Sequence, residues 1–267
     1  SRLSLCLHLF MENNSRDKIS FCLNKSFRFM ALLLVVVIAA WICKSIGFSV
    51  YRIPSLSMYP ALEPNEYVLV SKYPFNLRTP EYYPLTGIPF PYFFASGFGK
   101  VQREDIMVFD LPLFPAELHP ARKEDYIKRC LGLPGDTVLW YEDHYYLKKD
   151  VISNKNEIIK SQLLKDSATI SFVIPKKGAF IQLADSTQHI WESIVIRDGN
   201  TFGRDNSGIF LINGIQKLKY RAQQDYYFVQ GDNRRFSTDS RSWGLVPKSN
   251  LIGRAEVVLW PWPPRWL

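Results

Sequence analysis

The feature that most constrains the fold is an apolar run from Phe29 to Cys43 that contains no charged residue. This run is shorter than the ~18 to 20 residues that usually cross a bilayer. It becomes long enough if Lys44 lifts its amine to the interface and Ile46 to Val50 are included. No convincing small-x-small cleavage site follows it, so we interpret residues 29–50 as a retained transmembrane anchor rather than a removable signal peptide.

The residues before this anchor are polar and basic. Arg16, Lys18, Lys25 and Arg28 outnumber the acidic residues there, which places the N-terminus in the cytoplasm and everything after residue 50 on the outer face of the membrane. Residues 1–28 are therefore predicted to be a cytoplasmic tail. Within it, residues 1–10 precede the first methionine and are interpreted as an upstream extension.

Composition excludes some classes of protein. With 47% hydrophobic and 22% charged residues, the chain of 267 residues is expected to fold. The net charge of +8 is spread along the chain without an arginine-rich helix or an RNA-binding signature, so we expect no nucleic-acid partner. The four cysteines and four histidines lack metal-ligand spacing, so no metal site is expected.

Short β-rich segments dominate the remainder, and they predict a mostly β fold. Residues 51–140 and 226–267 are predicted to form one core, and the lysine-rich stretch 141–225 an inserted β subdomain with a short helix at Asn154–Leu164. The aromatic loop 75–99 faces either the membrane or the core, and the tail WPWPPRWL either enters lipid headgroups or packs on its own core. The predicted strands are Tyr67–Ser71, Ile106–Phe109, Tyr126–Leu133, Thr137–Trp140, Ile170–Ile174, Phe180–Leu183, Ile209–Ile212, Tyr226–Val229 and Ala255–Leu259.

Three distant segments carry the candidate chemistry. The first, YRIPSLSMYPAL from Tyr51 to Leu62, holds serines and a methionine between prolines that restrict the backbone. The second is YIKR with Lys128, and the third is SxDSR from Ser237 to Arg241. None of the four histidines lies in a motif, so a Ser-His-Asp triad has no candidate base, and attention moves to Lys128.

A lysine can serve as a base for a serine if its amine loses its proton near neutral pH. Its ordinary pKa is ~10.4, but full burial lowers the pKa by roughly 3 to 5. Tyr126, Ile127 and Met58 are apolar enough to provide such a setting if the strand carrying Lys128 faces the serine. By composition alone, an exposed strand lysine beside Arg129 would be the commoner situation.

These motifs, in this order, resemble the bacterial type I signal peptidases, which are membrane-anchored endopeptidases with a Ser/Lys dyad. The matching pieces are the anchor, IPSLSMYPAL, YVLVSKYPF, REDIMVF, YIKRCLGLPGD and GDNRRFSTDSRSWGLVP. The sequence departs from the usual family pattern at Ala61, Asn65, Glu66, Arg235 and Phe236. None of these five positions belongs to the dyad.

The resemblance implies a role for each matching residue. Ser57 is the expected nucleophile and Lys128 the general base, while Ser55 donates to the oxyanion and Ser237 orients the lysine. The supporting residues are Asp239, Arg241 and Met58, and the expected substrate pockets are built by Tyr51, Ile53, Val108 and Ile127.

The expected partners are membrane lipid and secretory preproteins that carry small residues one and three positions before the cut. No cofactor is implied. Three alternatives are a peptidase dedicated to one pilin-like or conjugation substrate, an inactive membrane-anchored peptide-binding homologue, and a soluble secreted protease.

Overall fold

The computed structural model describes residues 27–40, 47–78, 94–97, 99–110, 125–141, 144–148 and 170–267. The chain divides into two units, residues 1–47 and residues 48–267. The predicted helix Asn154–Leu164, the upstream extension and most of the aromatic loop lie outside the described residues. The division at residues 141 and 226 stays a prediction.

In the first unit, residues 27–40 are helical and their side chains are exposed. No helix among the described residues has both the length and the apolar character needed to cross a membrane. The transmembrane anchor at residues 29–50 therefore also stays a prediction, except at its C-terminal end. Residues 48–50 belong instead to a strand, because Phe48, Ser49 and Val50 pair with Ser71, Val70 and Leu69.

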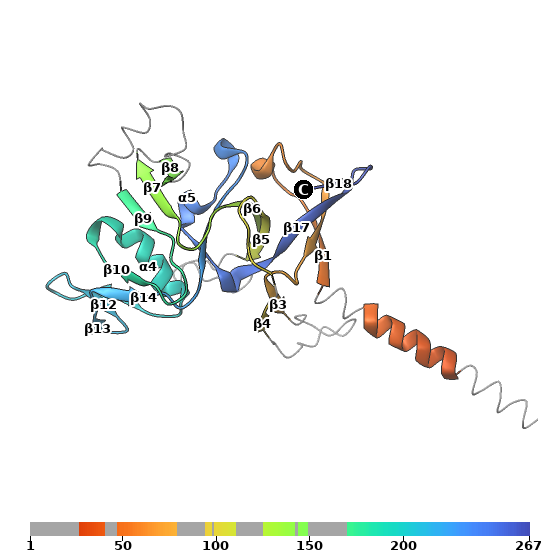
Figure 1. The fold of residues 1–267 in the computed structure, drawn as a ribbon, viewed down its shortest axis with the longest axis horizontal. Helices are drawn as coiled ribbons and strands as arrows, with labels where there is room; N and C mark the ends of the chain where they lie inside the picture. The colour runs from red at the N-terminus through yellow and green to blue at the C-terminus, as the bar shows by residue number, and fades with distance from the viewer. Residues whose placement is uncertain are drawn as a thin grey trace, which may run out of the picture. The chain divides into compact units, whose positions relative to one another are not determined.

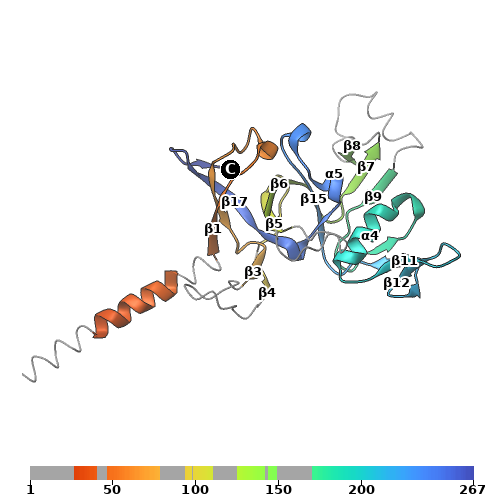
Figure 2. The same ribbon diagram turned by 180° about the vertical axis from the view of Figure 1, so that it is seen from behind.

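The second unit is mostly β, as the sequence predicts (Figures 1 and 2). Its main sheet is antiparallel, and its strand order brings distant parts of the chain together. In spatial order it contains β1 (Phe48–Arg52), β2 (Tyr67–Ser71), β17 (Leu251–Trp260), β5 (Ile106–Asp110), β6 (Asp125–Gly132), β15 (Tyr226–Gln230) and β16 (Val246–Pro247), and β18 (Arg265–Trp266) pairs with β17.

Smaller sheets accompany this main sheet, and short helical segments connect strands. The small sheets are β3 (Asn76–Arg78) with β4 (Phe94–Ser96); β8 (His144–Leu147), β7 (Thr137–Tyr141) and β9 (Ile170–Val173); β10 (Phe180–Gln182) with β14 (Lys219–Arg221); and β11 (Phe202–Arg204), β12 (Phe210–Ile212) and β13 (Ile215–Gln216). The helical segments are η2 (Leu56–Met58), η4 (Asp185–Thr187), α4 (Gln188–Arg197), η5 (Arg234–Phe236), α5 (Ser240–Trp243) and η6 (Lys248–Asn250).

Helix α4 is a feature that the sequence reading missed, since it treated residues 141–225 as strands with one earlier helix. Ile190, Trp191, Ile194 and Val195 are buried along one side of α4, the spacing of an amphipathic helix. They pack in a cluster that also contains Tyr226 of β15 and Leu245. The inserted stretch therefore shares its core with the main sheet.

Two further clusters of buried side chains involve the main sheet, and they position the candidate site. One contains Ile53, Met58 and Val108 and joins β1, η2, β2, β5 and β17. The other contains Met107, Cys130 and Val229 and joins β5, β6 and β15. Neighbouring residues of β5, Met107 and Val108, thus belong to different clusters, as strand alternation requires.

The C-terminal tail folds back on the sheet. Residues Arg265 and Trp266 pair with Val258 and Val257 of β17, and the Leu267 amide donates to the Glu256 carbonyl at 3.0 Å. Trp260, Trp262 and Trp266 nevertheless stay 59%, 76% and 81% exposed. The tail backbone is therefore fixed to the core while its indoles face outward.

Candidate active site

Ser57 lies in η2, a single turn between β1 and β2. The next residue, Met58, is completely buried in the cluster with Ile53 and Val108, and its carbonyl accepts from the Leu62 amide at 2.9 Å. Burial of Met58 anchors the turn in the core. Ser57, which is 6% exposed, is therefore held in one place.

Lys128 approaches the turn from β6. Its side chain is buried, with 4% of the residue exposed, and Nζ donates to the Ser57 hydroxyl oxygen at 2.7 Å. The Ser55 hydroxyl donates to the same oxygen at 3.2 Å. The structure thus brings together Ser55, Ser57 and Lys128, which are up to 73 positions apart in the sequence.

Burial lowers the pKa of Lys128 to about 8, while the charges of Asp239 and Asp232 oppose the shift. Desolvation disfavours the ammonium because the interior cannot replace its hydration shell. A substantial fraction of the amine is therefore neutral near pH 8. A neutral amine at hydrogen-bond distance can take a proton from a serine hydroxyl.

The segment from Gly231 to Arg241 closes over the carbonyl side of Ser57. The Asn233 amide donates to the Ser57 carbonyl at 3.0 Å. Gly231 is needed there because a Cβ at this position would lie 2.5 Å from that carbonyl oxygen. Position 231 thus requires glycine because the backbone approaches Ser57 closely. Position 244 favours glycine for another reason, since its φ of +86° is a left-handed turn conformation.

Asp239 organises this segment from a fully buried position. Its carboxylate accepts from the Gly231 amide at 3.0 Å, from the Ser237 hydroxyl at 2.8 Å and from Arg241 Nε at 2.8 Å. Burial alone would raise the pKa of Asp239, but these hydrogen bonds, led by Arg241, hold the pKa below its ordinary value. Asp239 therefore stays a carboxylate at neutral pH.

Ser237 lies in the same segment, but its hydroxyl is directed to Asp239. Among the described residues, no hydrogen bond joins Ser237 to Lys128. The role of Ser237 in orienting the lysine stays a prediction. In the structure, Arg241 and Ser237 both donate hydrogen bonds to the carboxylate of Asp239.

The four expected substrate-pocket residues belong to one cluster with Met58. Ile53 and Val108 are buried, whereas Tyr51 and Ile127 are partly exposed. Val108 and Ile127 are register partners on β5 and β6. An apolar surface therefore adjoins the Ser57 turn, and its accessible side chains are Tyr51 and Ile127.

Sequence reasoning missed one ion pair beside the site. Arg129 Nε and Nη2 donate to the two carboxylate oxygens of Asp232 at 2.8 and 2.7 Å. Arg129 adjoins Lys128 and Asp232 adjoins Gly231, so the pair connects the two segments that carry the site. Local sequence does not reveal this pair, because 103 positions separate the partners.

The described residues offer no obvious metal site, since no three His, Cys, Asp or Glu side chains among them gather to hold an ion. The site contains a serine hydroxyl that is hydrogen-bonded to a buried amine. This is the arrangement that a serine hydrolase with a lysine base requires.

Comparison with known proteins supplies the family. The family model for signal peptidase, peptidase S26, matches residues 26–260. Signal peptidase I of Pseudomonas aeruginosa is 28% identical over 272 residues, which covers 95% of this chain and 77% of that protein. Signal peptidase I of Buchnera aphidicola subsp. Schizaphis graminum is 27% identical over 250 residues, with 87% and 74% covered.

A solved signal peptidase I from Enterococcus faecalis V583 shares 23% identity, covers 58% of this chain and 96% of its own, and superposes with a TM-score of 0.24. The match of the family model over most of the chain decides the assignment. The protein belongs to the signal peptidase S26 family of serine endopeptidases, which confirms the resemblance drawn from the sequence.

Proposed function

We propose that this protein is a bacterial signal peptidase I that removes signal peptides from secretory preproteins with Ser57 as nucleophile and Lys128 as general base. The observation that carries the proposal is the 2.7 Å hydrogen bond between Lys128 Nζ and Ser57 Oγ in a buried setting. Signal peptidase I relatives from several bacteria support the substrate class.

In the first half of the reaction, the neutral Lys128 amine takes the Ser57 proton as the serine oxygen attacks the scissile carbonyl. The negative charge on the carbonyl oxygen is stabilised by the Ser57 amide and the Ser55 hydroxyl, which already lies 3.2 Å from Ser57 Oγ. The Lys128 ammonium then gives its proton to the leaving amine. An acyl-enzyme and the released mature chain result.

In the second half, Lys128 takes a proton from water, and the resulting hydroxide attacks the acyl carbonyl. The ester bond to Ser57 breaks, and Lys128 returns the proton to the Ser57 oxygen. The signal peptide leaves with a free carboxylate, and the enzyme regains its starting state. The accessible apolar side chains Tyr51 and Ile127 are suited to the small residues before the cut.

Replacing either member of the pair tests this mechanism. Ser57→Ala and Lys128→Ala should each abolish preprotein cleavage, because one lacks the attacking oxygen and the other lacks the base. Circular dichroism should show an intact fold, and Lys176→Ala, which changes an exposed lysine, should cleave normally. Full activity in Lys128→Ala would refute the proposed base.

We also propose that the apolar run within residues 29–47 anchors the enzyme in the bacterial cytoplasmic membrane, with the catalytic unit on the outer face and in contact with lipid. Large apolar side chains of residues 27–40 are exposed, among them Phe29 and Leu33, and such a surface needs a cover. The exposed indoles of the tail suit the headgroup level. Cell fractionation tests the anchor, and recovery of the full chain in a soluble fraction would contradict it.

A further inference from the structure

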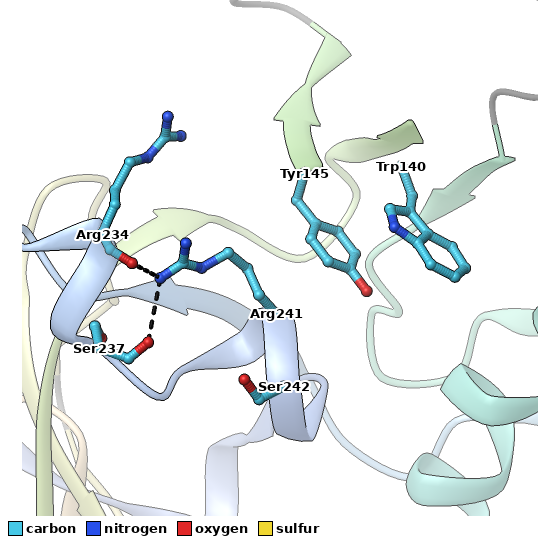
Figure 3. A pocket seen from close by; sticks show the side chains of 6 residues that line it. All are labelled: Trp140, Tyr145, Arg234, Ser237, Arg241 and Ser242. Atoms are coloured by element: carbon cyan, nitrogen blue, oxygen red, sulfur yellow. Dashed lines mark hydrogen bonds between the residues drawn. The ribbon is translucent and has the colours of Figure 1, made fainter. Parts of the chain in front are cut away.

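A cavity of about 330 Å³ lies beside the candidate active site, and the proposed mechanism leaves most of its lining unused (Figure 3). Its size is at the lower end for ligand pockets, so it suits a side chain rather than a whole cofactor. The lining residues are Trp140, Tyr145, Arg234, Ser237, Arg241 and Ser242.

The described residues that line the cavity carry an unbalanced positive charge. Arg241 is neutralised by the buried carboxylate of Asp239, to which its Nε and Nη2 donate at 2.8 and 2.9 Å. Arg234 is exposed, and its guanidinium has no hydrogen-bond or ion-pair partner among the described residues. No carboxylate is among the described residues that line the cavity, so this lining can accept one negative group.

The opposite wall is flat and aromatic. Trp140 of β7 and Tyr145 of β8 are register partners, and their rings stack with centroids 5.9 Å apart and planes within 5°. Figure 3 shows both rings across the cavity from the Arg241 guanidinium. A cavity lined by an aromatic wall and two arginines matches a side chain with a methylene stem and a charged end, which describes glutamate and aspartate.

The cavity shares a segment of chain with the nucleophile. The Arg234 carbonyl accepts from Arg241 Nη2 at 2.8 Å, and the preceding residue, Asn233, donates its amide to the Ser57 carbonyl. A polypeptide extended past Ser57 gains about 3.3 Å per residue, so about six residues span ~20 Å. The apolar cluster around Met58 is the expected site for residues before the cut, which leaves this cavity for residues after it.

We propose that this cavity binds the carboxylate of a glutamate or aspartate within the first six or so residues of the mature chain. The inference rests on the proposed function, because it needs a polypeptide bound at Ser57. It adds a specificity determinant on the product side of the cut, with Arg234 as its charged contact.

The test compares peptides that carry one signal-peptide cleavage site and differ by glutamate or glutamine at each of the first six positions after the cut. For the wild type, glutamate at one position should raise kcat/KM about fivefold over glutamine, the scale of a partly exposed ion pair. Arg234→Gln should bring this ratio to about one. Arg235→Gln changes an exposed arginine outside the cavity and should preserve the ratio.

Salt gives a second readout, because the preference should fade in about 1 M sodium chloride, where charges are screened beyond ~3 Å. Equal rates for glutamate and glutamine at all six positions, or an unchanged ratio in Arg234→Gln, would overturn the inference while leaving the proposed function standing. Failure of the wild type to cut any of the peptides would overturn the proposed function and the inference with it.

Discussion

Lys128 is suited to the proposed role of base because β6 holds it away from water while η2 holds Ser57 against it. Three influences meet at its amine: burial, which lowers the pKa, and the carboxylates of Asp239 and Asp232, which raise it. Burial prevails and the pKa lies at about 8. The two carboxylates therefore keep the amine from losing its proton at still lower pH.

The pH dependence of cleavage follows from this balance. Below pH 8 Lys128 is protonated and cannot accept the Ser57 proton, so kcat/KM should rise nearly tenfold per pH unit and level off above about 8. Asp232→Asn removes a charge that favours the ammonium, so the midpoint should move to lower pH. Cleavage rates from a stopped assay at a series of pH values measure the slope of the wild-type profile and the midpoint of the variant. A flat wild-type profile between pH 6 and 9, or a higher midpoint in the variant, would contradict the assignment.

At the scale of elements, the site depends on three pieces of chain packed against one another: η2, β6 and the segment 231–241. Gly231 and Ser57 meet so closely that nothing larger than hydrogen fits between them. Asp239 holds the other end of the segment through Arg241 and Ser237. The geometry of the pair is therefore set by backbone contacts as well as by the two reacting side chains.

Gly231→Ala tests this dependence. The added methyl would meet the Ser57 carbonyl oxygen and the Ser237 side chain, so the segment must shift, and a shift of about 1 Å at a reacting group can reduce the rate ~100-fold. We expect that loss in kcat/KM, together with a lower urea midpoint. Gly203→Ala is the matched control, because no atom lies within 4 Å of the added Cβ. Equal activity of both variants would show that the close contact is unimportant.

The sequence allowed β2, β5, β6, β15 and part of β17 to be predicted from their runs of β-branched and aromatic residues, whereas β1, β16 and β18 of the same sheet were missed. β2 has the predicted bounds, and β6 differs by one residue at each end. Helix α4 was missed although Ile190, Trp191, Ile194 and Val195 have helical spacing, since these residues also favour strands. The spacing of these four residues indicated a helix, whereas their residue types did not.

The residues of the candidate site could be named from the sequence, but the contacts that they make could not. Ser57 and Lys128 lie in recognisable motifs, whereas the bond from Ser237 to Asp239 and the pairing of Arg129 with Asp232 are products of packing. Local sequence cannot specify which acceptor a hydroxyl reaches. For the same reason, no sequence motif predicts the cavity beside Arg234.

At the scale of the whole molecule, the C-terminus secures the hairpin that carries Ser57. Arg265 Nη2 donates to both carboxylate oxygens of Glu66 at 2.7 Å, and its Nη1 donates to the Ala61 carbonyl at 2.9 Å. The Glu66 carbonyl in turn accepts from the Ile53 amide at 2.9 Å. The last residues of the chain thus fasten both sides of the η2 turn.

Arg265→Ala should therefore destabilise the enzyme. It leaves the buried Glu66 carboxylate without its cation, and because Arg265 itself is partly exposed we expect a loss of about 1 to 2 kcal/mol in the free energy of unfolding. Urea titration measures it, with Arg235→Ala as the control at an exposed arginine. Identical midpoints for Arg265→Ala and wild type would mean that the tail contributes nothing to the core.

The proposed mechanism requires that Ser57 is acylated with the help of Lys128. Mixing the enzyme with an activated ester of a small-residue peptide, quenching in acid and mapping the digest by mass spectrometry tests it directly. We expect the acyl group on the peptide containing Ser57, and accumulation at least ~100-fold slower in Lys128→Ala. An acyl group on another residue, or equally fast labelling without Lys128, would contradict the account.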